Sequence, residues 1–89
     1  MEPIEIQLKH PIPFGEERIG IIKIRRPVAR DYRGVRDLDR PISVMLDVIA
    51  SQNNLPGKVI DEIDGVEDLP RLLEAASGFF EESRATSLS

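Results

Sequence analysis

Residues 21–32, IIKIRRPVARDY, contain the point at which the spacing of apolar residues changes along this 89-residue chain. Before Pro27 the apolar residues alternate with polar ones, and after it they recur every three or four residues. Strand side chains alternate faces, whereas helix side chains return to one face after about 3.6 residues. Pro27 suits a first helical turn and pushes Arg26 toward extended geometry. The sequence therefore predicts an α+β fold, an N-terminal β-hairpin followed by three or four helices.

The predicted hairpin lies on the N-terminal side of this boundary. Residues 4–8 alternate as a strand with one apolar face, and residues 10–15 read as an extended edge segment running into a turn at Gly15. Residues 19–24 form the second strand, which is apolar on both faces. One layer of helices cannot cover both faces, so we expect the chain to self-associate through Ile22 and Ile24.

The predicted helices lie on the C-terminal side. The first covers residues 27–36, and the second and most apolar runs from Pro41 or Ile42 to Ser51. A short third helix follows with Asn54 as its cap. The fourth begins with Asp68 as N-cap, which places Pro70 at the second helical position. We expect a single domain over residues 1–82 and a flexible tail over residues 83–89.

Composition limits the class of protein. Cysteine is absent, so there is no disulfide framework and no zinc–thiolate site, which fits a reducing cytoplasm. No apolar run approaches the roughly 18 residues that a membrane helix needs, and the N-terminus lacks the pattern of a signal peptide. These features predict a small cytoplasmic domain with no membrane contact.

Charge is divided unevenly along the chain. Residues 1–40 hold nine basic and seven acidic residues, whereas residues 41–89 hold three basic and nine acidic ones. One interpretation of the basic stretch between Lys23 and Arg40 is a patch for an acidic partner or nucleic acid. The other is a solvated surface partly neutralised by neighbouring aspartates. Tyr32 is the one aromatic residue in this stretch, and stacking on bases needs more than one.

Residues suited to catalysis or metal binding are few. His10 is the single histidine and stands before Pro11 in an extended segment, where an exposed edge residue is a simpler interpretation than a general base. The carboxylates within residues 61–68 do not match the spacing of a calcium-binding loop, so a solvated helix junction is the simpler interpretation. We expect a protein that is not an enzyme and that holds no cofactor and no metal.

The last predicted helix carries a candidate partner-binding stripe. It includes Leu69, Leu72, Phe79 and Phe80. The two phenylalanines are adjacent, so on a helix they point about 100° apart, and one can fill the core while the other lies at its edge. A wide core face and an apolar contact for a partner are both open interpretations.

Four stretches of the chain carry a resemblance to a known family. They are I-x-L-x-x-P-I-x-F-G at residues 6–15, I-x-I-R-x-P-x-x-x-D-Y at residues 22–32, the apolar helix at residues 45–50 with Leu55-Pro56, and Glu67-Asp68-Leu69 with Phe79-Phe80. In this order they resemble the phage tail assembly chaperone family of Mu-like and related contractile-tailed phages. The resemblance covers residues 5–80, and Gly34 in the first predicted helix departs from it.

The resemblance implies a role without catalysis. Such proteins keep the tape measure protein, a very long apolar helical chain, soluble until tail tube subunits polymerise around it. The expected partners are the tape measure protein, the tail tube protein as a further candidate, and other copies of this chain. The expected place is the host cytoplasm and not the mature virion. The alternative is a small nucleic-acid-binding regulator that uses the stretch between Lys23 and Arg40.

Overall fold

The computed structural model describes the backbone of residues 3–88 and the side chains of residues 3–79. The chain begins with strands β1 (Ile4–Phe14) and β2 (Glu17–Ile24), which form an antiparallel hairpin. Gly15 in the turn has a φ of 64°, a left-handed conformation that glycine adopts without steric cost. The predicted α+β class and the N-terminal hairpin are confirmed.

Pairing in the hairpin is irregular in the middle of β1. Gln7 pairs with Ile21 and Ile12 with Ile19, so residues 8–11 lie opposite a single residue of β2. Such a bulge disrupts the alternation by which neighbouring N–H groups of a strand point to opposite sides. The N–H groups of Lys9 and His10 both donate to one carboxylate outside the sheet. The bulge therefore creates an anchoring point for another element.

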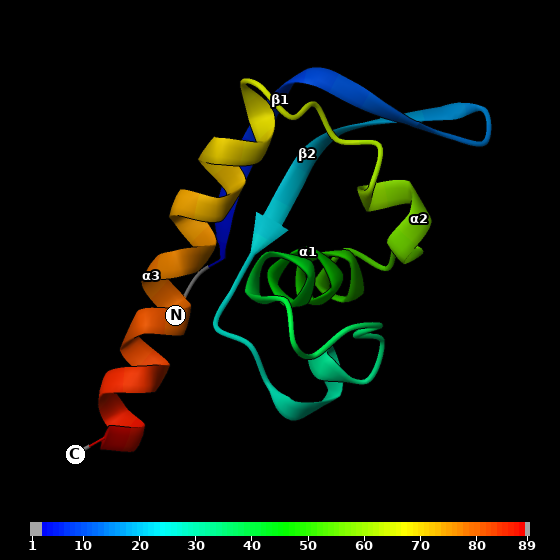
Figure 1. Cartoon of the computed structure of the whole chain (residues 1–89). Helices are drawn as coiled ribbons and strands as arrows, with labels where there is room; N and C mark the ends of the chain where they lie inside the picture. Colours follow the sequence, from blue (N-terminus) through cyan, green and yellow to red (C-terminus); the bar gives the residue numbers. More distant parts are fainter. Residues whose placement is uncertain (1–2, 89) are drawn as a thin grey trace.

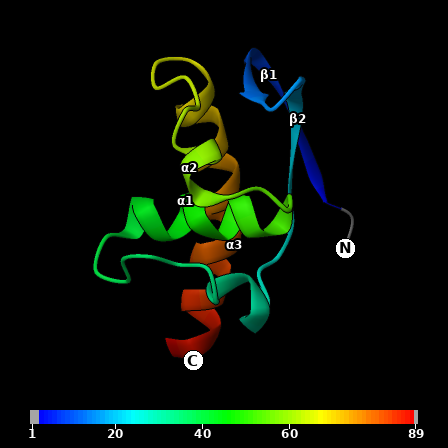
Figure 2. The same cartoon turned by 90° about the vertical axis from the view of Figure 1, so that its right-hand side faces the viewer.

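Helical segments follow the hairpin (Figure 1). Within residues 3–88 they are the 3₁₀-helix η1 (Ala29–Tyr32) and the α-helices α1 (Pro41–Gln52), α2 (Gly57–Ile60) and α3 (Asp68–Leu88). Helix α3 packs against β1, and α1 packs against β2 and η1. Figure 2 shows the hairpin on one side and the helices on the other, with α1 running across α3. The helix predicted over residues 41–51 is confirmed as α1.

The core lies between the helices and one face of the hairpin. Its side chains come from β1 (Leu8, Ile12), β2 (Ile22, Ile24), α1 and the residues after it (Ile49, Ala50, Leu55, Ile60, Ile63) and α3 (Leu72, Ala76, Phe79). The opposite face of the hairpin carries exposed side chains, among them Glu5, Ile21 and Lys23. The hairpin is therefore covered on one face only.

The helix predicted over residues 27–36 is wrong, because only the four-residue η1 forms there. Val28 is extended, with φ −118° and ψ 167°, so no helix begins at Pro27. The Asp31 carboxylate accepts the Val28 N–H and two N–H groups of the Arg25 guanidinium, each at 2.9 Å. These hydrogen bonds hold a tight turn that competes with a regular helix, and Gly34 disfavours its extension.

The predicted cap of the third helix is also wrong. Asn54 lies directly after α1 in the left-handed conformation, with a φ of 56°. Asparagine is one of the few residues other than glycine that tolerate this conformation, which often ends a helix. Helix α2 begins one residue after Pro56, so Asn54 serves the exit from α1 and not the entry to α2.

The last helix has a different cap from the predicted one. Asp68 is the first residue of α3, and the Asp64 carboxylate accepts the N–H groups of Val66, Glu67 and Asp68. Asp64 therefore satisfies the unpaired donors at this helix start. Helix α3 continues to Leu88. The flexibility expected for residues 83–89 and the domain boundary at residue 82 stay predictions.

Candidate functional site

Helix α3 carries the residues predicted to bind a partner. Leu72 and Phe79 are in the core, 0% and 8% exposed, and Leu69 packs partly buried against it. The side chain of Phe80 lies outside the described residues. Leu72 and Phe79 therefore hold α3 on the hairpin, and a partner reaches them only if α3 moves away.

Part of α3 extends beyond this packed face. Figure 1 shows α3 running beside the hairpin and continuing past it, with its C-terminal turns standing apart from α1. Phe79 is the last residue of α3 whose side chain the structure describes, and nine of the helix's 21 residues follow it. The backbone at the end of α3 therefore projects past the hairpin, and the side chains of residues 80–88 lie outside the described residues.

Asp68 fixes the start of α3 to the hairpin. Its side chain is 0% exposed, and its two oxygens accept the N–H groups of Lys9 and His10, each at 2.9 Å. The Arg71 guanidinium lies 3.5 Å from the same carboxylate and donates to the Gln7 carbonyl. A carboxylate and a guanidinium thus cover the outer edge of β1 at its bulge.

Exposed charges surround this anchor. Glu67 accepts a hydrogen bond from the Lys9 ammonium at 3.0 Å and contacts His10 Nε2 at 3.1 Å. The hydrogen bond with Glu67 raises the pKa of His10, and the hydrogen bonds with His10 and Lys9 lower the pKa of Glu67. The His10 side chain is exposed, and its role here is to pair with Glu67.

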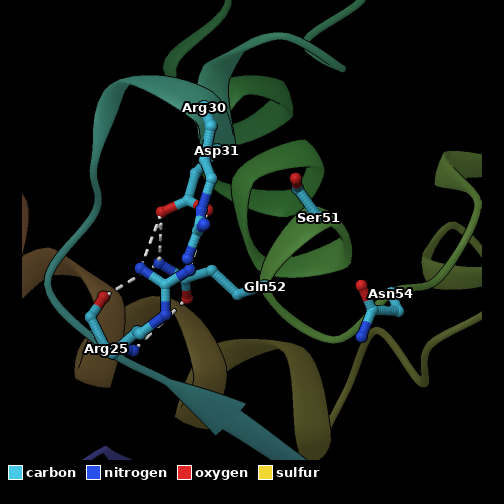
Figure 3. Close-up of a pocket in the computed structure, with 6 residues that line it drawn as sticks. All are labelled: Arg25, Arg30, Asp31, Ser51, Gln52 and Asn54. Carbon is cyan, nitrogen blue, oxygen red and sulfur yellow. Dashed lines mark hydrogen bonds and ion pairs between the residues drawn. The ribbon is translucent and has the colours of Figure 1, made fainter.

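An open polar pocket of about 530 Å³ lies between η1 and the end of α1. Figure 3 shows Arg25 and Asp31 facing each other on one side of it, with Gln52 beside them and Ser51 and Asn54 on the other side. Burial raises the pKa of Asp31, but hydrogen bonds from Val28 and Arg25 outweigh burial, so the pKa is lowered overall. The ionised Asp31 therefore neutralises Arg25 on that side of the pocket.

A second buried carboxylate joins the loop after η1 to two helices. Asp47 on α1 is 3% exposed and accepts hydrogen bonds from the Arg36 backbone N–H and guanidinium. The same guanidinium donates to both oxygens of Asp61 after α2. Burial raises the pKa of Asp47, but the hydrogen bonds from Arg36 outweigh burial, so the pKa is lowered overall. Gly57 leaves room for this group, since a Cβ there would lie 2.9 Å from Arg36 Cζ.

These pairs account for much of the basic stretch between Lys23 and Arg40. The intramolecular pairs are Lys23–Glu5, Arg25–Asp31, Arg36–Asp47, Arg36–Asp61 and Arg40–Asp37. Cations engaged by carboxylates are less available to phosphate groups. The geometry therefore favours the structural interpretation of this stretch over a nucleic-acid surface.

Ile22 and Ile24, expected to mediate self-association, lie in the core. They are 0% and 2% exposed, because the helices cover their face of β2. Ile21, on the opposite face, is 52% exposed. Side chains available to a second copy are therefore on the Ile21 face, and self-association itself stays a prediction.

Sequence reasoning missed the residues that connect the elements. Asp31, Asp47 and Asp68 are buried, and Gln52 and Asn53 make hydrogen bonds to the backbone of β2 and the residue after it. One signal was available for Asp47, which stands among apolar residues of α1 on a stretch predicted to be buried. Asp68 also had a signal, its place at a helix start, but its backbone partners on β1 are distant in sequence.

Two further properties follow from the described part of the chain. Among residues 3–88, no helix is both long and apolar enough to cross a membrane. Among the side chains of residues 3–79, no three from His, Asp or Glu converge in a way that could hold a metal ion. Of the carboxylates in residues 61–68, Asp64 caps α3, Asp61 pairs with Arg36 and Asp68 anchors β1.

The described chain is thus a small α+β domain whose charged groups mostly engage one another. Comparison with models of known protein families identifies its family. The model of the family described as "Phage tail assembly chaperone proteins, E, or 41 or 14" matches residues 5–81 of the 89. The chain belongs to this family of phage tail assembly chaperones, which confirms the predicted resemblance. No curated protein and no solved structure matched the chain.

Proposed function

We propose that this tail assembly chaperone binds the tape measure protein and keeps it soluble while the tail tube forms. The observation that carries the proposal is the family match over residues 5–81. The match covers the hairpin, α1, α2 and most of α3, so the proposal concerns the whole fold and not one motif.

Helix α3 is the proposed contact. A helical client binds in a groove or along a helix through anchors spaced at i, i+3, i+4 and i+7, and a few large residues supply most of the energy. The end of α3 stands apart from α1 (Figure 1), which supports its choice as the contact. Leu72 and Phe79 act indirectly, because both belong to the core that positions α3. Among the predicted partner residues, Phe80 is the one to test for direct contact, with Leu69 at the edge of the core.

The proposal also covers where the chain acts and which other proteins it contacts. The chain acts without catalysis in the host cytoplasm and is left out of the mature virion. The tail tube protein is a second candidate partner, since it polymerises around the client. Self-association belongs to the same proposal, and light scattering of the purified chain tests it by comparing the measured mass with the 10.0 kDa of one copy.

Co-expression with the tape measure protein of the same phage tests the main proposal. The soluble fraction of the client is measured with the wild-type chain, with Phe80→Ala and with the matched control Glu74→Ala, which changes an exposed residue of α3. We expect the wild-type chain and Glu74→Ala to keep the client soluble. Phe80→Ala should remain folded by circular dichroism and fail to do so.

Two results would contradict the proposal at different levels. If folded Phe80→Ala solubilises the client as well as the wild type does, α3 is not the contact. If the wild-type chain never solubilises the client and instead binds DNA with an affinity that falls steeply with salt, the regulator alternative is correct.

A further inference from the structure

The outer edge of β2 is occupied by side-chain amides from the end of α1. Lys23 N–H donates to Asn53 Oδ1 at 2.9 Å, and Asn53 Nδ2 donates to the Lys23 carbonyl at 2.9 Å. A side-chain amide carries the same donor and acceptor groups as a backbone peptide. Asn53 therefore takes the place that a residue of a neighbouring strand would take.

Gln52 makes the same pair of hydrogen bonds with Arg25, which lies two residues after Lys23. Arg25 N–H donates to Gln52 Oε1 at 3.3 Å, and Gln52 Nε2 donates to the Arg25 carbonyl at 3.0 Å. Residues 23 and 25 have the two-residue spacing at which a strand presents its backbone groups to one side. Figure 3 shows Gln52 reaching from α1 toward Arg25. Gln52, the last residue of α1, and Asn53, which follows it, thus pair with the backbone of Arg25 and Lys23, two consecutive outward-facing positions of the strand edge.

Further hydrogen bonds hold both amides in place. Asn53 Nδ2 also donates to the Ile49 carbonyl at 2.8 Å, and Gln52 Nε2 also lies 3.4 Å from Asp31 Oδ2. The amides are therefore tied to α1 and to η1 as well as to the hairpin. An incoming strand would have to displace these contacts before it could pair with Lys23 and Arg25.

We propose that the outer edge of β2 is a strand-pairing surface for a second copy of this chain, and that Gln52 and Asn53 keep it closed. An unpaired strand edge is a template for another strand, and proteins commonly cover such edges. With both amides in place, any self-association of the unaltered chain uses a different surface. The proposal is independent of the tape measure protein.

A second copy fits this edge by its own sequence once the amides are removed. In an antiparallel pairing of β2 with itself centred on Ile21, the two Ile21 side chains, each 52% exposed in one copy, lie opposite each other. Two-fold symmetry makes such an interface self-complementary, and the cross-strand apolar pair of the two Ile21 side chains stabilises it.

Substitution of the two amides tests the proposal. Gln52→Ala combined with Asn53→Ala, the matched control Ser51→Ala and the wild type are compared by light scattering at equal concentrations. We expect the double variant to reach twice the mass of the wild type in a concentration-dependent way, whereas Ser51→Ala keeps the wild-type mass. Adding Ile21→Lys to the double variant should restore the wild-type mass, because two lysines would then lie directly opposite.

Amide hydrogen exchange separates the edge from other effects. In the wild type, the Lys23 and Arg25 amides should be protected, and rapid exchange there would overturn the proposal. A folded double variant whose Lys23 amide exchanges rapidly but whose mass is unchanged would also overturn it. Should the double variant not fold, Asn53→Ala alone serves as the test, because it removes both the acceptor for Lys23 N–H and the donor to the Lys23 carbonyl and leaves Gln52 in place. The same two outcomes then decide.

Discussion

Asp68 joins the first turn of α3 to the bulge of β1, two parts of the chain that lie 58 and 59 residues apart. Its carboxylate offers only acceptors, and both N–H groups that it meets are backbone donors on the outer edge of the hairpin. A buried donor without an acceptor costs free energy, so this one side chain satisfies two groups at once. The bulge and the carboxylate depend on each other.

Replacement of Asp68 by asparagine tests this dependence. The amide has one oxygen and places its NH₂ group against a backbone N–H, so one buried donor loses its acceptor. We expect Asp68→Asn to lower the free energy of unfolding by about 1–3 kcal/mol, measured by urea denaturation. Glu62→Gln, on an exposed neighbouring residue, should leave the midpoint close to the wild-type value. An unchanged midpoint in Asp68→Asn would show that the two N–H groups find other partners.

The roles of the buried aspartates could not be predicted from their residue type. Asp31, Asp47 and Asp68 are chemically the same as exposed aspartates elsewhere in the chain, and aspartate is seldom fully buried unless paired. Their partners Arg25 and Arg36, and the backbone of β1, become neighbours only after the chain has folded. Sequence spacing carries little of this information.

At the scale of elements, the period of the apolar residues was the reliable signal. It placed the two strands, α1 and the start of α3 close to their observed bounds, because each buries one face against the core. It failed for residues 27–36, where side-chain hydrogen bonds to Asp31 decide the backbone and Val28 and Tyr32 remain exposed. It also could not say which face of β2 is covered, since both faces are apolar.

The packing of α3 gives the prediction at this scale. Phe79 is 8% exposed and belongs to the core with Leu72 and Ala76. Truncation of such a residue loses buried apolar area and leaves a cavity, so Phe79→Ala should lower the free energy of unfolding by about 3–5 kcal/mol. Glu74→Ala, on an exposed position of the same helix, is the control and should change it by less than about 0.5 kcal/mol. Similar denaturation midpoints for both variants would mean that α3 is not held by this core.

At the scale of the whole molecule, the unevenly distributed charges form ion pairs within the chain. Basic residues of the first half pair with acidic residues of the second, as in Lys9 with Glu67 and Arg36 with Asp47 and Asp61. The sequence showed the asymmetry but left open whether it serves an external partner or the fold. The observed pairs connect β1 with α3 and the loop after η1 with α1 and α2. Much of the asymmetry is therefore satisfied internally.

This arrangement predicts that the fold is weakened by acid. The pKa values of Asp31 and Asp47 are lowered in the folded chain, in each case because hydrogen bonds from an arginine and a backbone N–H outweigh the effect of burial. A carboxyl whose pKa is lower when folded than when unfolded stabilises the fold above its unfolded pKa, about 3.9 for aspartate. That stabilisation is lost as the pH falls from there through the folded pKa, because folding then opposes proton uptake.

Urea denaturation across pH measures this effect. We expect the free energy of unfolding to fall as the pH drops below about 4. His10 acts in the opposite direction, since its raised pKa gives stabilisation that is lost as the pH rises through the folded value, and its exposure keeps this effect small. Asp31→Asn should be less stable than the wild type at pH 6, because Arg25 loses its charged partner, and should lose less further stability on acidification. If the wild type keeps one midpoint from pH 6 to well below 4, or if Asp31→Asn shows the same acid dependence as the wild type, the buried ion pairs do not control the response to acid.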